Sequence, residues 1–507
     1  MNNLLRSGYK RNTILLIAIA TGIRLLLSGI VELNNDEVYY CTYARQLQWN
    51  YFDHPPMVAL CIRFFTNALQ WHHEFFVRLA PVTGAAIATW LAFLTGRKLK
   101  DNRTGWIAAC LFTASFYSSV IAGLLILPDS PQLVFWMLFV YLSVCISQSR
   151  SRRRTNLMLL LLGVAAGFCI LSKIHGLFCW LGFGGYILFC RRELLKNPFL
   201  YLGAMITIVM ILPSFMWSFN NEMGTYDYHS ERVAIHHLQP DSFVRELFGS
   251  IFYNNPVNIS LLIAALVAFR KRLASIALLL WLGLPLIVTV LFLSLFNDTL
   301  PHWSGPGYTT LILVTALYLT EQSLSFSERV TKVSIYLTVF ALIGAILLIN
   351  FWPGTLGSKK QQEFGKHDVT LDMSGWRAFG KDFAVLYRKD ADSSKTSPRF
   401  IFSNYWFPAG HLDFYVAQPA GLNVKAVGSL HDIHHFAWLN QRLPQMKKGE
   451  NAYYISISNF NDPVPEVLVK NFEQVSSPVL IPQIRSGKIA RYFYVYRLNG
   501  FKGEQPL

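Results

Sequence analysis

Apolar runs of about 20 residues recur along the first 352 positions of this chain, and they constrain its fold more than any other feature. A helix of that length crosses the hydrocarbon core of a bilayer, because each residue adds about 1.5 Å. Only 15% of the 507 residues are charged, which is low for a soluble domain. The sequence therefore predicts a polytopic α-helical membrane protein.

The apolar segments predict about eleven transmembrane helices. We expect the first to be retained, because no small-residue cleavage site follows it and further spans come after it. The approximate bounds of the predicted spans are 13–33, 76–96, 105–126, 131–147, 157–173, 175–190, 199–219, 256–270, 275–296, 304–320 and 332–352.

The loops between these segments differ in charge, and the difference alternates along the chain. Loops such as "GRKLKDNR" and "SQSRSRRRTN" are basic, whereas loops such as 34–75 and "NDTLPHWSG" hold acids, histidines and prolines. Basic loops stay in the cytoplasm, so the N-terminus is expected there, and an odd number of spans puts the C-terminal tail outside. The net charge of +16 is concentrated in these short basic loops, so we expect no nucleic-acid partner.

The tail has a different character from the membrane part. We expect a transmembrane domain at 1–352 and an extracytoplasmic α/β domain at 353–507, which is long enough for one compact domain. Alternation and strand propensity predict strands at "RFIFS", "NVKAVG", "AYYISIS" and "RYFYVYRL". Helices are expected between them, at "YWFPAGHLDFYV" and "HHFAWLNQRL".

The first outer loop carries two pairs of candidate functional residues. Asp36 and Glu37 follow the first span, and adjacent acids point in different directions, so one of them is expected to face a substrate. A carboxylate at the edge of a low-dielectric cavity suits a general base for an alcohol, while a solvated helix cap is the structural alternative. Asp53 and His54 precede two prolines that stiffen the backbone. Such a pair suits a divalent cation or a phosphate but does not define a metal site alone.

Three shorter outer loops add further candidates. Asp129 in "LPDSP" suits an active site, or it caps the helix that follows. Lys173 and His175 in "LSKIHG" lie between two apolar segments. A lysine there needs water or an anion, unless it snorkels to the interface. His302 in "LPHWSGPGY" precedes a tryptophan, a residue that commonly anchors a membrane interface.

A long outer loop, "YHSERVAIHH", offers His229 and Arg232. Arginine with histidine suits a phosphate, or a metal that bridges a phosphate, and an exposed polar loop is the alternative. Inside the first predicted span, Arg24 is expected to meet an internal partner or a water-filled cavity rather than lipid.

The ordered set of these motifs resembles the integral-membrane GT-C glycosyltransferases of the protein O-mannosyltransferase type. That group includes the bacterial transferase of aminoarabinose to lipid A. The motifs that carry the resemblance are "NNDEVYYCTYARQL", "YFDHPPMVAL", "LPDSPQLVFW", "LSKIHGL" and "HWSGPGY". They cover the membrane part in order, and the tail segment "SNYWFPAGHLDFYV" resembles the extracytoplasmic domain of the bacterial branch.

The resemblance implies roles for several residues. Asp36 matches the acid that deprotonates the acceptor hydroxyl, and Glu37 completes the pair of acids. Asp53 is implied to lie near a metal or the donor phosphate, and His54 replaces a phosphate-binding lysine of the family. His229 is implied as a metal ligand. The cofactor stays open between a divalent metal ion (Mg, Mn or Zn) and none, because members of the family differ in their need for metal.

The implied reaction is a single inverting displacement on a polyprenyl-phosphate sugar. Lys173, Arg232 and His54 would bind the donor phosphate, and Asp129, His175 and His302 are further active-site candidates. The acceptor is expected to be lipid A, another glycan or a protein. The expected location is the inner membrane, with the site on the periplasmic face. No nucleotide-binding motif is present, which favours a lipid-linked donor. A transporter or flippase of a lipid-linked sugar is the alternative, although it would require polar residues along a path across the membrane.

Overall fold

The computed structural model describes residues 2–221, 237–393, 398–460 and 463–503. The chain divides into two compact units. The helical unit comprises Met1–Ser28 and Leu47–Ala341, and the α/β unit comprises Gly29–Gln46 and Leu342–Leu507. The predicted domain boundary after residue 352 remains a prediction. The α/β unit takes in part of the first outer loop, which no sequence feature indicated.

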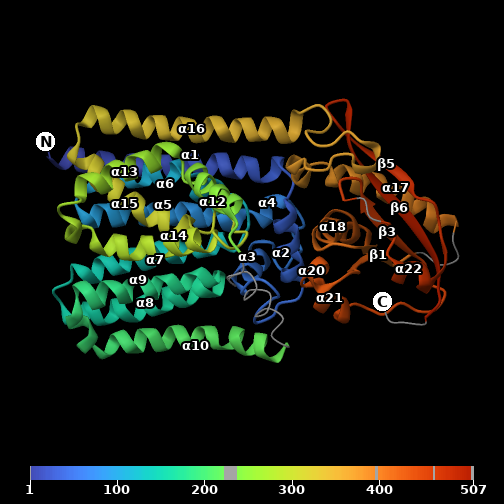
Figure 1. Ribbon diagram of the computed structural model, residues 1–507, viewed down its shortest axis with the longest axis horizontal. Helices are drawn as coiled ribbons and strands as arrows, with labels where there is room; N and C mark the ends of the chain where they lie inside the picture. The colour runs from blue at the N-terminus through green and yellow to red at the C-terminus, as the bar shows by residue number, and fades with distance from the viewer. Residues whose placement is uncertain (1, 222–236, 394–397, 461–462, 504–507) are drawn as a thin grey trace. The chain divides into compact units, whose positions relative to one another are not determined.

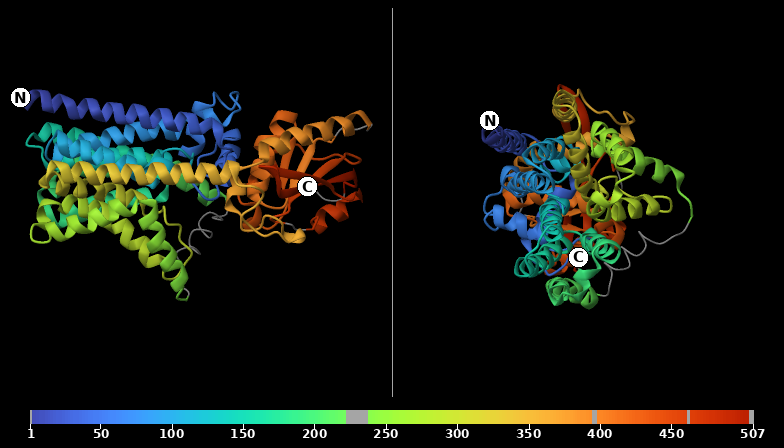
Figure 2. Two further views of the ribbon diagram at one scale, coloured as in Figure 1. Left: turned by 90° about the horizontal axis from the view of Figure 1, so that it is seen from above. Right: turned by 90° about the vertical axis from the view of Figure 1, so that its left-hand side faces the viewer.

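The helical unit is built from long apolar helices that run alongside one another (Figures 1 and 2). Its elements are α1 (Asn2–Ile30, ending in the other unit), α3 (Met57–Phe65), α4 (Glu74–Val77), α5 (Leu79–Leu99), α6 (Asn102–Ala114), η1 (Tyr117–Ile121), α7 (Asp129–Ser147), α8 (Arg152–Ser172), η2 (Ile174–Gly176), α9 (Leu177–Cys190), η3 (Arg192–Lys196), α10 (Pro198–Asn220), α12 (Pro240–Tyr253), α13 (Pro256–Phe269), η4 (Leu273–Ser275), α14 (Ala277–Leu293), α15 (Gly305–Glu321) and α16 (Leu324–Phe351, which continues into the other unit).

A helix lies at each of the predicted apolar segments, although several segments contain a break. The segment predicted at 105–126 is broken, because α6 ends at Ala114 and a π-helical turn, η1, follows it. In the described part of the chain, six helices are long and apolar enough to cross a membrane, and the bent pair α12–α13 would make a seventh. The count of eleven spans therefore stays a prediction.

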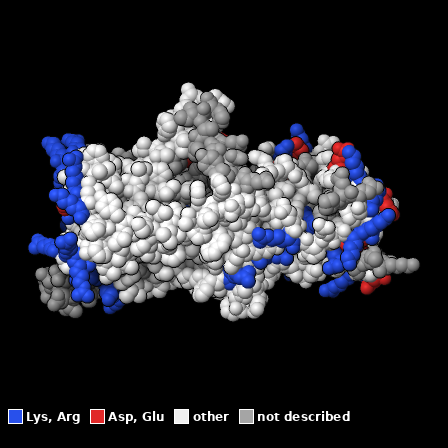
Figure 3. Space-filling view, turned by 90° about the horizontal axis from the view of Figure 1, so that it is seen from below, with Lys and Arg blue, Asp and Glu red and all other residues white. Residues whose placement is uncertain are grey.

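The surface of the helical unit agrees with a membrane environment. Figure 3 shows a broad face of this unit almost without charged side chains, and Lys and Arg gather at the end where α1 begins. The expectation for Arg24 is confirmed. The residue is 6% exposed, and its guanidinium donates to the carbonyl and hydroxyl oxygens of Ser119 at 3.1 and 3.0 Å.

The α/β unit contains a mixed sheet flanked by helices. The strands are β1 (Phe400–Ser403), β2 (Asn423–Ala426), β3 (Ala452–Ile457), β4 (Phe472–Val475), β5 (Val479–Arg485) and β6 (Lys488–Phe501). Their order is β2-β1-β3-β6-β4, and β5 also pairs with β6. Strand β1 is parallel to β2 and β3, and β6 is antiparallel to its neighbours. The helices are α2 (Asn35–Arg45), η5 (Gln361–Glu363), η6 (Val369–Met373), α17 (Trp376–Ser393), α18 (Trp406–Leu412), η7 (Asp413–Ala417), α19 (Gln418–Ala420), α20 (Leu430–Ile433), α21 (Phe436–Arg442) and α22 (Glu466–Asn471).

The four predicted strands of the tail correspond to β1, β2, β3 and β6, and the two predicted helices to α18 and α21. Strands β4 and β5 were not predicted. In β5 the exposed positions alternate regularly with less exposed ones, but Leu480 and Ile484 are exposed whereas Gln483 and Arg485 are buried, the reverse of the usual strand signal. Pro482 weakens that signal further. These strands form because the 14-residue β6 offers them a long partner.

Candidate active site

A buried ion pair in the helical unit joins two of the predicted site residues. The ammonium of Lys173 lies 2.8 Å from Oδ2 of Asp129, and the two side chains are 4% and 2% exposed. Asp129 is the first residue of α7 and Lys173 directly follows α8, so the ends of two packed helices bring them together. A charge this far from water is stable only when it is paired, and here each side chain provides the other's partner.

Two alternatives for these residues do not apply. The side chain of Asp129 contacts Lys173 and Tyr117 instead of capping α7. Lys173 is too deeply buried to snorkel to an interface. The ammonium gives one of its three N–H donors to Asp129, and the described residues provide no acceptor for the other two.

Tyr117 completes this cluster and was not predicted. Its hydroxyl donates to Oδ1 of Asp129 at 3.1 Å from the π-helical turn η1. A Cβ on Gly305 would lie only 2.4–2.5 Å from the Tyr117 ring, so the first glycine of "SGPG" leaves the space that the ring occupies. A tyrosine inside an apolar run gives no sequence signal. The π-helical turn, a feature often found at functional sites, becomes visible only in the structure.

Two predicted histidines lie at the same cluster. Nε2 of His302 is 4.0 Å from Oδ2 of Asp129, and the ring of His175 packs against that of Trp303 with centroids 5.6 Å apart. Burial lowers the pKa of His302 to about 4, since the opposing influence of Asp129 is smaller. His302 is therefore neutral near pH 7. Its ring can donate a hydrogen bond from one nitrogen and accept one at the other without adding charge to the site.

A second buried carboxylate, Glu246 of α12, was also missed by the sequence analysis. It is fully buried and accepts hydrogen bonds from Thr299 at 2.9 Å and Ser304 at 3.4 Å. Both donors come from the loop that carries His302. The sequence around Glu246, "FVRELF", is typical of an ordinary amphipathic helix, so burial of the acid could not be predicted.

Asp36 and Glu37 lie in the first turn of α2, in the α/β unit, and they differ sharply in exposure. Glu37 is fully buried and forms a capping box with Asn34: its carboxylate accepts from the Asn34 N–H at 3.0 Å, and the Asn34 side chain accepts from the Glu37 N–H at 2.9 Å. Asp36 is exposed. The cap interpretation thus describes Glu37, whereas Asp36 is the acid of the pair that a substrate could reach.

The remaining candidates are more widely distributed. Asp53 and His54 are half-buried in the turn before α3, where the Tyr51 N–H donates to the His54 carbonyl at 3.2 Å. His229 and Arg232 lie outside the described residues. In the described part of the chain, no three His, Cys, Asp or Glu side chains converge on a point that could hold a metal ion. Of the two metal-ligand candidates, Asp53 and His229, only Asp53 lies within the described residues, and we derive no step through a metal.

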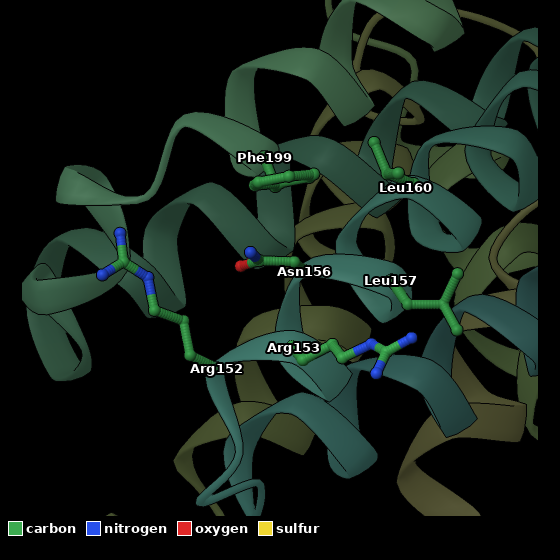
Figure 4. Close-up of a pocket in the computed structure, with 6 residues that line it drawn as sticks. All are labelled: Arg152, Arg153, Asn156, Leu157, Leu160 and Phe199. Atoms are coloured by element: carbon green, nitrogen blue, oxygen red, sulfur yellow. The ribbon is translucent and has the colours of Figure 1, made fainter.

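A surface hollow between the first turns of α8 and α10 is separate from the cluster (Figure 4). It is lined by Arg152, Arg153, Asn156, Leu157, Leu160 and Phe199. Helix α8 has 21 residues, so its first turn and Lys173 at its far end are about 30 Å apart. The hollow therefore contributes nothing to the candidate site.

Comparison with known proteins relates the chain to membrane glycosyltransferases. Residues 53–217 match the family described as dolichyl-phosphate-mannose-protein mannosyltransferase. The lipid A galacturonosyltransferase RgtD of Rhizobium johnstonii is 21% identical over 297 residues, which cover 56% of this chain and 60% of that protein. The chain thus spans about three fifths of the length of this curated relative.

Solved structures match over nearly the whole chain. ArnT from Cupriavidus metallidurans in the apo state has a TM-score of 0.65 and 13% identity, covering 96% of this chain and 98% of that chain. The same protein bound to undecaprenyl phosphate has a TM-score of 0.67 and 15% identity, with the same coverage. The fold is a GT-C fold of the ArnT type. This ArnT-type fold confirms the predicted fold class, a helical membrane part with a C-terminal α/β sheet domain.

Proposed function

We propose that the protein is a membrane glycosyltransferase that moves a sugar from a polyprenyl-phosphate-linked donor to an acceptor hydroxyl. The observation that carries this proposal is the ArnT-type fold, which extends over 96% of the chain and which, in ArnT itself, binds undecaprenyl phosphate. The match to a mannosyltransferase family and the similarity to a lipid A galacturonosyltransferase support sugar transfer. The acceptor is lipid A, another glycan or a protein, and the reaction takes place on the periplasmic face of an inner membrane.

The proposed chemistry is one displacement at the anomeric carbon. The acceptor oxygen attacks that carbon and gives its proton to the carboxylate of Asp36, which is exposed and therefore accessible. The bond between the anomeric carbon and the phosphate oxygen breaks, and its electron pair leaves with the lipid phosphate. Attack opposite to the leaving group inverts the anomeric configuration. Glu37 holds the first turn of α2 and so fixes the backbone that carries the base.

The leaving phosphate requires positive charge more than it requires a general acid. We assign the contact with the leaving phosphate to Lys173, because it retains two N–H donors while Asp129 balances its charge. Tyr117 donates to the carboxylate of Asp129, and that carboxylate holds the Lys173 ammonium, with the ring of His302 lying 4.0 Å away. We assign further phosphate contacts to His54 and Arg232.

The test compares envelope lipids, glycans and glycoproteins by mass spectrometry in cells with the intact chain, with a deletion and with Asp36→Asn. Loss of the general base should slow transfer about 10²–10⁴-fold while the protein remains folded. We expect one sugar mass to disappear in both altered strains, which also names the sugar and the acceptor. Asp392→Asn, at an exposed aspartate of α17, is the matched control and should leave that mass unchanged.

Two outcomes would contradict the proposal in different ways. If Asp36→Asn keeps the sugar mass that the deletion removes, Asp36 is not the base. If the deletion causes unmodified lipid-linked sugar to accumulate on the cytoplasmic side, the protein transports its substrate, and the flippase alternative replaces the transferase.

A further inference from the structure

Within the α/β unit, residues 376–435 contact the segment that carries Asp36 at several points along its length. The carboxylate of Glu32, just before α2, accepts from the backbone N–H groups of Trp376 and Arg377 at 2.8 and 3.3 Å. These are the first two residues of α17. The start of a helix offers unpaired N–H donors and a positive dipole end, so an anionic side chain is well placed there. The chain is thereby fixed four residues before Asp36.

The next contacts fix the two residues that lead into the acid. The Leu33 N–H donates to the Tyr415 hydroxyl at 2.8 Å. The side-chain oxygen of Asn35 lies 2.9 Å from Nε2 of His411, on α18. Asn35 directly precedes Asp36, so this contact holds the residue next to the acid.

His411 is itself held rigidly. Its side chain is fully buried, and its ring stacks on the Trp376 indole with centroids 4.2 Å apart and planes 1° from parallel. Burial and the charge of Arg491 lower the pKa of His411 well below its usual value, so the ring is neutral and has a single N–H. That N–H donates from Nε2 to the Asn35 oxygen.

The body and the end of α2 also contact residues 376–435. Val38 and Tyr39 pack on Gly410, where an added Cβ would lie 3.1 Å from the Val38 methyl group and 3.2 Å from the Tyr39 nitrogen. The Tyr39 hydroxyl accepts a hydrogen bond from the backbone N–H of His435 at 3.0 Å. At the last residue of α2, Arg45 forms an ion pair with Asp413, which is 3% exposed.

We propose that residues 376–435 of the α/β unit position α2 of the same unit, and that His411 is a positioning residue for the reaction, acting on Asp36 through Asn35. This inference rests on the proposed transferase function and assigns a role to the C-terminal part of the chain. Residues 376–435 need not touch the sugar, because their contribution is the fixed direction of the Asp36 carboxylate. Misplacement of a reacting group by about 1 Å is enough to slow a reaction about a hundredfold.

The first experiment changes only the contact between His411 and Asn35. His411→Phe keeps an aromatic ring on Trp376 but removes the N–H donor, whereas His411→Gln restores a donor without the ring. Two quantities are measured on the full-length protein: hydrogen exchange of the backbone amides of 32–46, and the rate at which the sugar mass appears after expression is induced. We expect His411→Phe to raise exchange in α2 and to slow transfer about a hundredfold at unchanged protein level, and His411→Gln to recover part of both.

A charge swap gives a second test that does not involve His411. Arg45→Asp and Asp413→Arg should each raise exchange in α2 and slow transfer, and the double variant should restore both by reversing the pair. The control swap, Glu466→Lys with Lys470→Glu, reverses an exposed pair on α22 and should change neither quantity.

The outcomes separate this inference from the proposed function. Normal transfer in His411→Phe, or slowed transfer without increased exchange in α2, would overturn the positioning role. If the wild-type chain transfers no sugar, the proposed function fails. The exchange measurements would still be informative in that case. Increased exchange in His411→Phe and in the single-swap variants, with recovery in the double variant, would support the role of residues 376–435 in fixing α2.

Discussion

The helical unit and the α/β unit place their candidate acids in opposite environments. In the helical unit, Asp129 is buried and shares its charge with Lys173. In the α/β unit, Asp36 is exposed, and the buried acid next to it, Glu37, serves as a helix cap. A carboxylate that is paired with a cation inside an apolar bundle is a poor proton acceptor, because the cation favours its charged form. An exposed carboxylate on a rigid helix can accept a proton from a substrate. Burial thus makes Asp129 and Glu37 structural acids, whereas exposure leaves Asp36 available for chemistry.

Removing the cation from the buried Asp129–Lys173 pair should have the largest effect of the changes considered. Lys173→Met leaves Asp129 buried without a counter-charge, which should lower the free energy of unfolding by about 3–5 kcal/mol. Thermal unfolding of the detergent-solubilised protein measures the effect. Adding Asp129→Asn should recover most of the loss, because no uncompensated charge remains.

An exposed ion pair of the same unit provides the control for this measurement. Arg245 and Asp298 are 52% and 77% exposed, and Arg245→Ala should lower stability by about 1 kcal/mol or less. Equal effects of Lys173→Met and Arg245→Ala would mean that the Asp129–Lys173 pair is hydrated, and the contrast between the two regions would fail.

A smaller effect is expected from disturbing the packing of α2. Gly410→Ala places a methyl group 3.1 Å from Val38 and 3.2 Å from the Tyr39 backbone, so α2 or α18 must move. Such overpacking typically destabilises a protein by about 1–3 kcal/mol, and the melting temperature reports it. Gly184→Ala in α9 meets no atom within 4 Å and should instead leave stability unchanged or raise it by about 0.5–1 kcal/mol. A stable Gly410→Ala variant would show that α2 tolerates displacement.

The smallest effect concerns the titration of Asp372, which interacts with Asn35. Burial raises the pKa of Asp372 to about 6, and the opposing effects of Arg491 and Asn35 are weaker. The folded state therefore binds this proton more tightly than the unfolded state, whose carboxyl has a pKa of about 3.9. The resulting stabilisation is complete below pH 4 and is lost as the pH rises through about 6.

Asp372→Asn should remove this pH dependence. Its melting temperature should exceed that of the wild type at pH 8, by about 2–4 °C, and should equal it at pH 4. Asp392→Asn, at an exposed position, should show no such difference between the two pH values. A constant offset for Asp372→Asn at every pH would indicate that the carboxyl does not titrate in this range.

Particular elements show how far the sequence could predict the structure. The apolar runs located the long helices of the helical unit, such as α5, α8, α10 and α16, since the length of a bilayer-crossing helix is a local property. Four of the six strands in the described part of the α/β unit could be found by alternation. Asp129, Lys173 and His302 were selected as candidates, but nothing in the sequence indicated that they lie together.

The residues that were missed share a physical cause. Tyr117 and Glu246 acquire their importance only from distant partners, Asp129 in the first case and the loop of His302 in the second. Periodicity and propensity describe neighbours along the chain, and they contain no information about such pairs.

The sequence by itself predicted the apolar helices, the change to an α/β tail and a pair of acids after the first apolar segment. Only the tertiary structure decided that Lys173 pairs with Asp129, 44 positions away, and that Asn35 is held by His411, 376 positions away. The physical reason is that helix formation depends on local hydrogen bonds and apolar spacing. The partner of a buried polar group is selected by which segments pack together once the whole chain has folded.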